Sequence, residues 1–249
     1  MKYKILEVLE NNKGDFISGE LISSELGVTR TTVWKYIKNL KDEGYIIQSS
    51  SKKGYLLLPI PDVLNAHEIE HSLHTKYLGK EIYYLKTIGS TNQYSKKIAI
   101  EGCRDGALVV ADSQTSGKGR IGREWESRDK KGIWMSVVLK PEILPSRIQI
   151  ITLAASIAVV CGIKEATGIS TGIKWPNDII LDGKKVCGIL TEMSSELDRV
   201  NYIILGIGIN VNHSIDDFNS ELKSKATSLK IKKYSKNKPE IGRASCRER

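Results

Sequence analysis

The stretch SQTSGKGRIGREW, residues 113–125, contains glycines 117, 119 and 122 in the spacing G-x-G-x-x-G. A dinucleotide-binding loop of that spacing follows a strand and opens a helix within a βαβ unit. The preceding ALVVADS (107–113) predicts the strand, but REWESRDKKGIW (123–134) has no apolar face and predicts no helix. The P-loop is also excluded, because Arg123 and Glu124 stand where it requires Lys and Ser or Thr.

What remains is a glycine loop that carries three cations, Lys118, Arg120 and Arg123. Glycine lets backbone N–H groups approach a ligand closely, and neighbouring cations suit a carboxylate or a polyphosphate. The loop therefore favours an anion-binding site, and the competing interpretation is a solvated basic turn.

Two further stretches place polar side chains at the ends of predicted strands. IKWPNDIILDGKKVCGIL (173–190) predicts loop, strand, a two-residue Asp-Gly turn and strand. Its Lys174, Asn177, Asp178 and Lys185 lie among apolar residues, so their side chains could converge at one strand edge. YIILGIGINVN (202–212) predicts a buried strand that presents Asn210 at its end, a pattern that often lines a site.

Working outward to the amino terminus, residues 17–58 predict helix, tight turn, helix and hairpin. Gly27 suits the turn, and Thr29 suits the N-cap of the second helix. Val28 and Val33 stand where a hydrophobic staple forms. This order predicts a winged helix-turn-helix, which binds DNA by its second helix and its wing.

The exposed start of that second helix and the tip of the hairpin carry hydroxyls and cations suited to DNA. The predicted DNA-binding residues are Arg30, Thr31, Thr32, Lys35, Lys38, Lys52 and Lys53. A small helical docking module with a solvated basic face is the alternative.

The composition of the chain restricts the classes of protein it can belong to but does not indicate a function. The net charge is +9, but residues 221–249 alone carry ten basic and three acidic residues, so the total says little about partners. The four cysteines are far apart and form no C-x-x-C pair, which indicates reduced thiols and a cytoplasmic protein. We expect no secretory signal and no membrane-spanning segment.

Pro59 and Pro61 mark a boundary between two domains. In the segment that follows, residues 67–71 spell H-E-x-x-H, the zinc-protease pattern. We interpret it as an amphipathic linker helix, because a second acid, Glu70, lies inside the motif and no third ligand is evident. The predicted organisation is a winged helix-turn-helix at 1–60, a linker helix at 61–80, a catalytic domain at 81–231 and a tail at 232–249.

Four blocks together resemble biotin protein ligases in order and spacing: IGSTNQ (88–93), QTSGKGRIGREW (114–125), KWPNDIILDGKKVCGIL (174–190) and GIGINVN (206–212). With the amino-terminal module, the chain resembles the bifunctional ligase and biotin operon repressor from about residue 5 to about 230. The family loop usually begins G-R-G-R, and Lys118 fills the first basic place here. Lipoate ligases share the fold but lack this G-x-G-R-x-G-R loop.

The resemblance implies an α+β fold with a mixed-sheet catalytic domain similar to class II aminoacyl-tRNA synthetases. IQIITLAASIAVVCGIKEAT (148–167) is its clearest helix. In the family a small SH3-like barrel follows the catalytic core. Residues 232–249 are polar and lysine-rich, so we expect that barrel to be missing and the tail to be truncated or non-native.

The resemblance also implies roles for individual residues. For biotin it implies Ser90, Thr91, Asn92, Gln114, Lys118, Gly119, Arg120, Lys185 and Gly188. For ATP it implies Arg123, Lys174, Asn177, Asp178 and Asn210, with Asp178 alternatively orienting Lys185. Lys185 and Arg120 are the expected catalytic residues, whereas Trp125 and Trp134 are expected to pack.

The implied reaction activates biotin with ATP and transfers it to a lysine of a biotin carboxyl carrier protein. Mg²⁺ would neutralise phosphate oxygens without dedicated protein ligands. Operator DNA and a second copy of the chain, joined when the adenylate is bound, are the other implied partners. A biotin-sensing regulator without catalysis and a lipoate-type ligase are the alternatives.

Overall fold

The computed structural model describes residues 1–58 and 64–234, which form two compact units divided between Val63 and Leu64. The boundary predicted between residues 60 and 61 falls just before this division. The expectation for the tail falls almost wholly on residues 235–249, which lie outside the described residues.

The amino-terminal unit is a winged helix-turn-helix, as predicted. Its elements are α1 (Lys2–Asn11), α2 (Gly19–Leu26), α3 (Arg30–Asp42) and an antiparallel hairpin of β1 (Ile47–Ser50) and β2 (Gly54–Leu57). Gly27 takes the left-handed conformation at the end of α2, with φ of 64°. The Thr29 side chain accepts a hydrogen bond from the Thr32 N–H, which confirms the predicted N-cap of α3.

The second unit is built on one mixed sheet of seven strands, in the order β3-β4-β5-β9-β8-β7-β6. The strands are β3 (Ile82–Ile88), β4 (Leu108–Gln114), β5 (Gly132–Leu139), β6 (Gly172–Lys174), β7 (Asp178–Leu181), β8 (Lys184–Ser195) and β9 (Val200–Asn210). Only the β3–β4 pair is parallel, which confirms the predicted mixed sheet.

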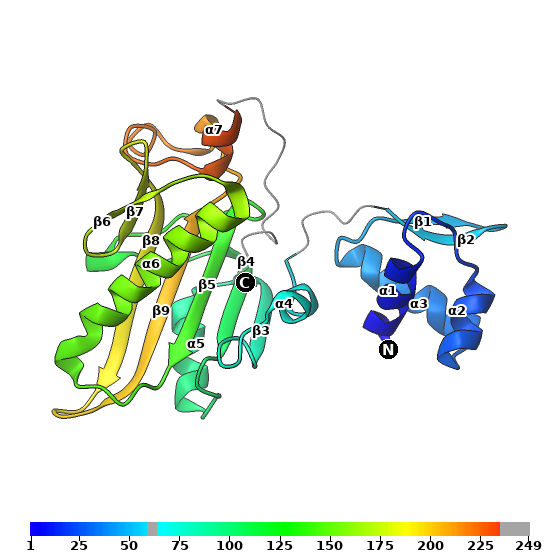
Figure 1. Cartoon of the computed structure of the whole chain (residues 1–249), viewed down its shortest axis with the longest axis horizontal. Helices are drawn as coiled ribbons and strands as arrows, with labels where there is room; N and C mark the ends of the chain where they lie inside the picture. The colour runs from blue at the N-terminus through cyan, green and yellow to red at the C-terminus, as the bar shows by residue number, and fades with distance from the viewer. Residues whose placement is uncertain (59–63, 235–249) are drawn as a thin grey trace. The chain divides into compact units, whose positions relative to one another are not determined.

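Helices cover the two faces of this sheet. Ile133 and Val137 of β5 pack with α6 (Ile148–Thr167), whereas the alternate residue Val138 packs with α5 (Thr91–Ile100). Because successive side chains of a strand point to opposite faces, α5 and α6 lie on opposite faces of the sheet (Figure 1). Asn92 at the start of α5 lies against the middle of the central strands, beside Ser136 of β5 and Gly206 of β9.

Helix α6 has the bounds predicted from the sequence. By length and composition alone, Pro145–Thr167 could cross a membrane, with a mean hydropathy of 1.8 and 17% of the stretch buried, although no such segment was expected. In the structure the helix lies across the sheet (Figure 1), and its inner side places Ala155, Val159 and Ile163 in the core.

The predicted hairpin between β7 and β8 is also present. Asp182 and Gly183 form its turn with φ of 50° and 78°, the left-handed pair that an Asp-Gly turn provides. The described part of the unit also contains two short α-helices, α4 (Ala66–Ser72) and α7 (Leu229–Tyr234). The H-E-x-x-H residues fall on α4, and within the described parts of the chain no three His, Cys, Asp or Glu side chains gather to hold a metal ion.

Candidate active site

A cavity of about 680 Å³ opens on the α5 face of the sheet. Its floor includes three glycines of neighbouring strands, Gly188 on β8 and Gly206 and Gly208 on β9. A Cβ atom at Gly208 would lie 2.5 Å from Trp125 Nε1, and one at Gly206 would lie 2.1 Å from Asn92 Oδ1. The floor must therefore be bare backbone for these two side chains to lie on it.

One wall of the cavity is polar and buried. Ser90, Thr91 and Asn92 begin α5 and are each less than 5% exposed. Gln114 ends β4 and faces them: its Oε1 accepts from the Thr91 N–H at 2.8 Å and lies 3.0 Å from Thr91 Oγ1. The wall thus offers fixed hydroxyl and amide groups suited to a small ligand that both donates and accepts hydrogen bonds.

The glycine loop folds over the cavity as a small hairpin. The Gly119 N–H donates to the Arg123 carbonyl at 2.7 Å, and the Trp125 N–H donates to the Gly117 carbonyl at 2.9 Å. A Cβ at Gly117 would lie 2.3 Å from the Trp125 carbonyl oxygen, so this place requires glycine. Ile121 at the tip has a φ of 57° and is 90% exposed. The tip is therefore an apolar edge free to cover a ligand.

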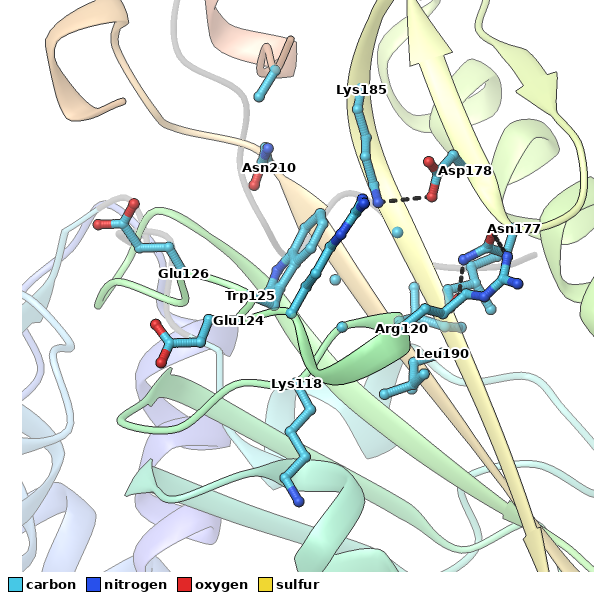
Figure 2. Close-up of a pocket in the computed structure, with 18 of the residues that line it drawn as sticks. Lys118, Arg120, Glu124, Trp125, Glu126, Asn177, Asp178, Lys185, Leu190 and Asn210 are labelled. Atoms are coloured by element: carbon cyan, nitrogen blue, oxygen red, sulfur yellow. Dashed lines mark hydrogen bonds and ion pairs between the residues drawn. The ribbon is translucent and has the colours of Figure 1, made fainter. Parts of the chain in front are cut away.

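Two cations meet anionic or amide partners inside the cavity (Figure 2). Lys185 Nζ lies 2.7 Å from Asp178 Oδ1 and 5.0 Å from the centre of the Trp125 ring. Arg120 donates to Asn177 Oδ1 at 2.7 Å, which joins the glycine loop to the segment before β7. Figure 2 also shows the Lys118 side chain directed away from Lys185. Lys185 and Arg120 are thus two cations of the cavity that are held in place by side-chain partners.

The cavity brings together every residue that the sequence assigned to biotin or ATP. They are Ser90, Thr91, Asn92, Gln114, Lys118, Gly119, Arg120, Arg123, Lys174, Asn177, Asp178, Lys185, Gly188 and Asn210. Asn210 also holds the chain beyond β9, because its Nδ2 donates to the Thr227 carbonyl at 3.1 Å. Proximity alone does not assign the ligand of each residue, so the division between biotin and ATP stays a prediction.

Some lining residues were not predicted. Both Trp125 and Trp134 were expected to pack. Trp134 is fully buried and does so, whereas Trp125 lines the cavity beside Gly188 and Gly208. His213 and Phe218 line the far end with stacked rings, 5.0 Å between centres. The aromatic residue that ends the glycine loop was a usable signal for Trp125, but no motif marked the other two.

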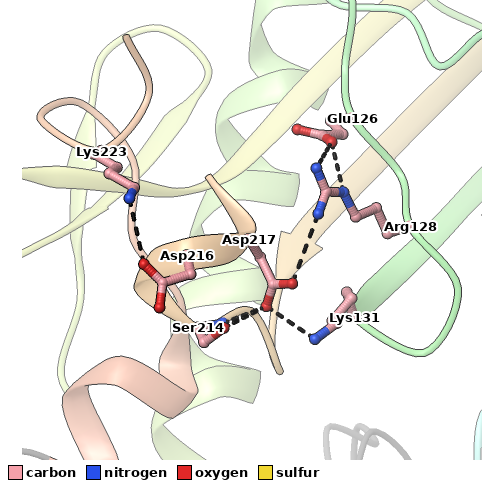
Figure 3. A network of polar contacts seen from close by, with 7 residues as sticks. All are labelled: Glu126, Arg128, Lys131, Ser214, Asp216, Asp217 and Lys223. Carbon is pink, nitrogen blue, oxygen red and sulfur yellow. Dashed lines mark hydrogen bonds and ion pairs between the residues drawn. The ribbon is translucent and has the colours of Figure 1, made fainter. Parts of the chain in front are cut away.

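A network of ion pairs fastens the segment that carries those two rings (Figure 3). Asp217 lies 2.9 Å from Lys131 Nζ and 3.7 Å from Arg128, and it accepts from the Ser214 N–H at 2.7 Å. Burial would raise the pKa of Asp217, but the hydrogen bonds from Lys131 and Ser214 outweigh it and hold that pKa far below its usual range. The turn at 214–217 is thereby tied to the residues that precede β5.

Stability of this segment should depend on pH through His213, which is 2% exposed. Burial lowers the pKa of His213 from 6.5 to about 4. As the pH falls from about 6.5 to about 4, His213 becomes protonated in the unfolded chain but stays neutral in the folded chain. The free energy of unfolding therefore decreases over that pH range. The loss amounts to roughly 3 kcal/mol at its end. Between pH 7 and pH 4.5 the melting temperature should fall less for His213→Leu than for the wild type. Equal decreases in the two proteins would contradict the role of His213.

The predicted DNA-binding residues all lie in the amino-terminal unit, but not all are equally available. Thr31, Lys35 and Lys38 are exposed on α3, and Lys52 and Lys53 are exposed at the hairpin tip. Arg30 forms an ion pair with Glu20, and the Thr32 hydroxyl lies 2.9 Å from the capping Thr29 hydroxyl. Trp34, which the sequence did not suggest, is 59% exposed on α3, with Lys38 Nζ 5.9 Å from its ring centre.

Comparison with known proteins places both units. Residues 84–210 match the biotin/lipoate A/B protein ligase family, and residues 2–56 match the HTH domain. The bifunctional ligase/repressor BirA of Bacillus spizizenii is 47% identical over 229 residues, which cover 92% of this chain and 70% of that protein. The protein of the same name from Escherichia coli is 31% identical, over 84% of this chain and 63% of that protein.

Among solved structures, the biotin protein ligase from Aquifex aeolicus in complex with biotin and ATP is 32% identical, with a TM-score of 0.54. The match covers 67% of this chain and 65% of that chain, so about a third of that protein has no counterpart in the alignment. Because the Bacillus relative is matched over 92% of this chain, the chain belongs to the biotin/lipoate A/B protein ligase family, and it carries an amino-terminal HTH domain.

Proposed function

We propose that the chain joins biotin to a lysine of a biotin carboxyl carrier protein. In the first step a biotin carboxylate oxygen attacks the α-phosphorus of ATP, pyrophosphate leaves and biotinyl-5′-AMP forms. In the second, the carrier lysine amine attacks the acyl carbon, loses a proton and displaces AMP. The observation that carries the proposal is one cavity lined both by the Lys185 and Arg120 cations and by a buried wall of hydroxyls and amides.

The first step brings two anions together, so the site must offset their repulsion. Lys185 projects from β8 into the cavity and would bridge the biotin carboxylate and the α-phosphate. Its pairing with Asp178 holds the ammonium in place before substrates arrive. Ser90, Thr91 and Gln114 would bind the ureido ring, while Lys174 and Asn177 would serve the nucleotide.

We assign Mg²⁺ to the phosphates of ATP rather than to a protein cage. No metal-binding cluster of three His, Cys, Asp or Glu side chains is found among residues 1–58 and 64–234. Mg²⁺ commonly enters such sites on substrate phosphates, where it neutralises charge on the oxygens. Asp178, already paired with Lys185, is one of the carboxylates that line the cavity.

Pyrophosphate release on mixing the protein with biotin and Mg-ATP tests the ligase assignment. A biotin-sensing regulator without catalysis would bind biotin in an isothermal titration but release no pyrophosphate. A lipoate-type ligase would release it with lipoate and not with biotin. The Lys185 and Arg120 pair favours the ligase, because a sensor needs no cation between two anions.

We further propose that the protein is cytoplasmic and represses biotin genes as a homodimer formed when the adenylate is bound. The exposed cations of α3 and of the hairpin tip support contact with DNA. Two half-sites increase the affinity only when two protomers are joined. The dimer would therefore couple the ligase reaction to repression.

Binding to a promoter fragment upstream of biotin genes should require both biotin and ATP, and should weaken steeply as salt rises. Lys35→Ala, on the exposed face of α3, should weaken binding by about tenfold, since one phosphate contact is lost. Mobility shifts at several salt concentrations measure both effects. A shift indifferent to biotin would indicate a constitutive DNA binder, and no shift at any salt concentration would remove the repressor role.

A further inference from the structure

An exposed tryptophan lies on α3, the second helix of the helix-turn-helix. Trp34 is 59% exposed, and it is not a member of the hydrophobic core that the described part of the amino-terminal unit forms. The tyrosines of this unit behave differently, because they are buried in that core or packed against it: Tyr3, Tyr36, Tyr45 and Tyr55. Packing of the core therefore does not explain why an indole stands at this position.

Trp34 shares the outer surface of α3 with cations. Residues three or four apart lie on the same side of a helix, so Thr31, Trp34 and Lys38 form a row, and all three are exposed. Lys35 is exposed beside this row. The Lys38 Nζ lies 5.9 Å from the centre of the indole, a distance at which a cation and an aromatic ring attract each other. The indole is thus a large apolar group set within a basic surface.

The charge around Trp34 favours a polyanion as the partner of this surface. The lysines of α3 suit phosphates, which supply most of the affinity of a protein for DNA. An apolar protein partner would have to bury the ammonium groups of Lys35 and Lys38, and burial of an unpaired charge is costly. The major groove of DNA admits an α-helix, so an indole on the outer side of α3 would meet the edges of base pairs there.

The chemistry of an indole limits what it can recognise on a base pair. It has one N–H donor and no acceptor, so it cannot form the paired hydrogen bonds by which Arg reads guanine or Asn reads adenine. It does have a large apolar surface. The apolar group that a base pair presents in the major groove is the C5-methyl group of thymine. An indole in that groove is therefore suited to thymine.

We propose that Trp34 is a specificity-determining residue for DNA: its indole packs against the C5-methyl group of thymine in the major groove, while the lysines beside it contact phosphates. This inference rests on the proposed function, because it takes the DNA upstream of biotin genes as the partner. It assigns apolar base recognition to a helix whose other proposed contacts are made by hydroxyls and cations.

Deoxyuridine provides the direct test, because it lacks the methyl group of thymine and keeps the same hydrogen-bonding edge. Competition binding with biotin and Mg-ATP present compares the promoter fragment with a copy that carries deoxyuridine at every thymine. Loss of one methyl contact should weaken binding by about fourfold, and two half-sites should together give about tenfold or more. Trp34→Ala should bind the thymine fragment about tenfold or more weakly, and should bind the two fragments within about twofold of each other.

Three further variants separate apolar recognition from other roles. Trp34→Phe keeps an aromatic ring without the N–H, so it should retain a preference for the thymine fragment. Lys35→Ala is the control on the same helix: a phosphate contact carries no sequence information, so binding to both fragments should weaken equally. Trp175→Ala removes an indole that is 70% exposed in the other unit, and it should change neither affinity by more than about twofold. Thermal unfolding of each variant checks that it is folded.

Equal binding of the two fragments by the wild type would overturn the inference, as would a thymine preference that persists in Trp34→Ala. A Trp34→Phe variant as weak as Trp34→Ala, with no thymine preference left, would indicate that the indole acts through its N–H, which also contradicts the inference. Unchanged DNA binding in Trp34→Ala would assign the indole to a protein partner instead. If the wild type shifts no fragment with biotin and ATP present, the proposed repressor function itself fails, which is a distinguishable result.

Discussion

Lys185→Ala is expected to lower the rate of biotinyl-adenylate formation by about a hundred- to a thousandfold, by analogy with removal of one oxyanion donor. The ammonium lies 2.7 Å from Asp178 and, in the proposed reaction, would stand between the two negatively charged reactants. The side chain is 34% exposed, so alanine should leave the fold intact. Single-turnover formation of the adenylate from labelled ATP is the direct measurement.

Lys184→Ala provides the neighbouring control. Lys184 carries the same charge one residue away, but it donates to the Lys223 carbonyl at 2.8 Å. Its removal should change adenylate formation by no more than about twofold. A Lys185 variant that forms adenylate at the rate of the Lys184 variant would refute the catalytic assignment.

Arg120→Gly is expected to release the adenylate at least about tenfold faster and to cause biotinylation of bystander proteins. Its guanidinium donates to Asn177 at 2.7 Å and is the contact that fastens the glycine loop to the opposite wall. Without it the loop opens more often, and the reactive intermediate escapes before a carrier arrives. A chase with unlabelled biotin measures the release rate, and labelling of added serum albumin measures escape.

Arg199→Gly is a suitable comparison. Within the described residues, the ion pair of Arg199 is with a neighbouring glutamate at the turn between β8 and β9. It should leave both readouts at their wild-type values. Labelling that stays confined to the carrier protein in the Arg120 variant would show that the loop does not act as a lid.

Local sequence rules were sufficient for much of this site. The Asp182-Gly183 turn, the buried strand β9 and the bounds of α6 follow from turn chemistry and apolar runs, and all three are confirmed. The glycine loop was predicted to follow a strand and to open no α-helix, and it forms a hairpin with one short 3₁₀ turn.

The parts that were missed depend on contacts between distant residues. Strand β6 was taken for a loop, because its three exposed residues form a strand only by pairing with β7. Trp125 was expected only to pack, yet it lies in the cavity because two strands bring Gly188 and Gly208 under it.

The glycines beneath the cavity set a limit for anyone who wishes to redesign it. A pocket floored by side chains can be deepened by trimming them, but Gly188, Gly206 and Gly208 leave nothing to trim. Any added carbon there meets Trp125 or Asn92 at less than 3 Å. Room for a bulkier biotin analogue must therefore come from the sides, above all from the Trp125 indole, and the depth of the pocket is fixed by the main chain.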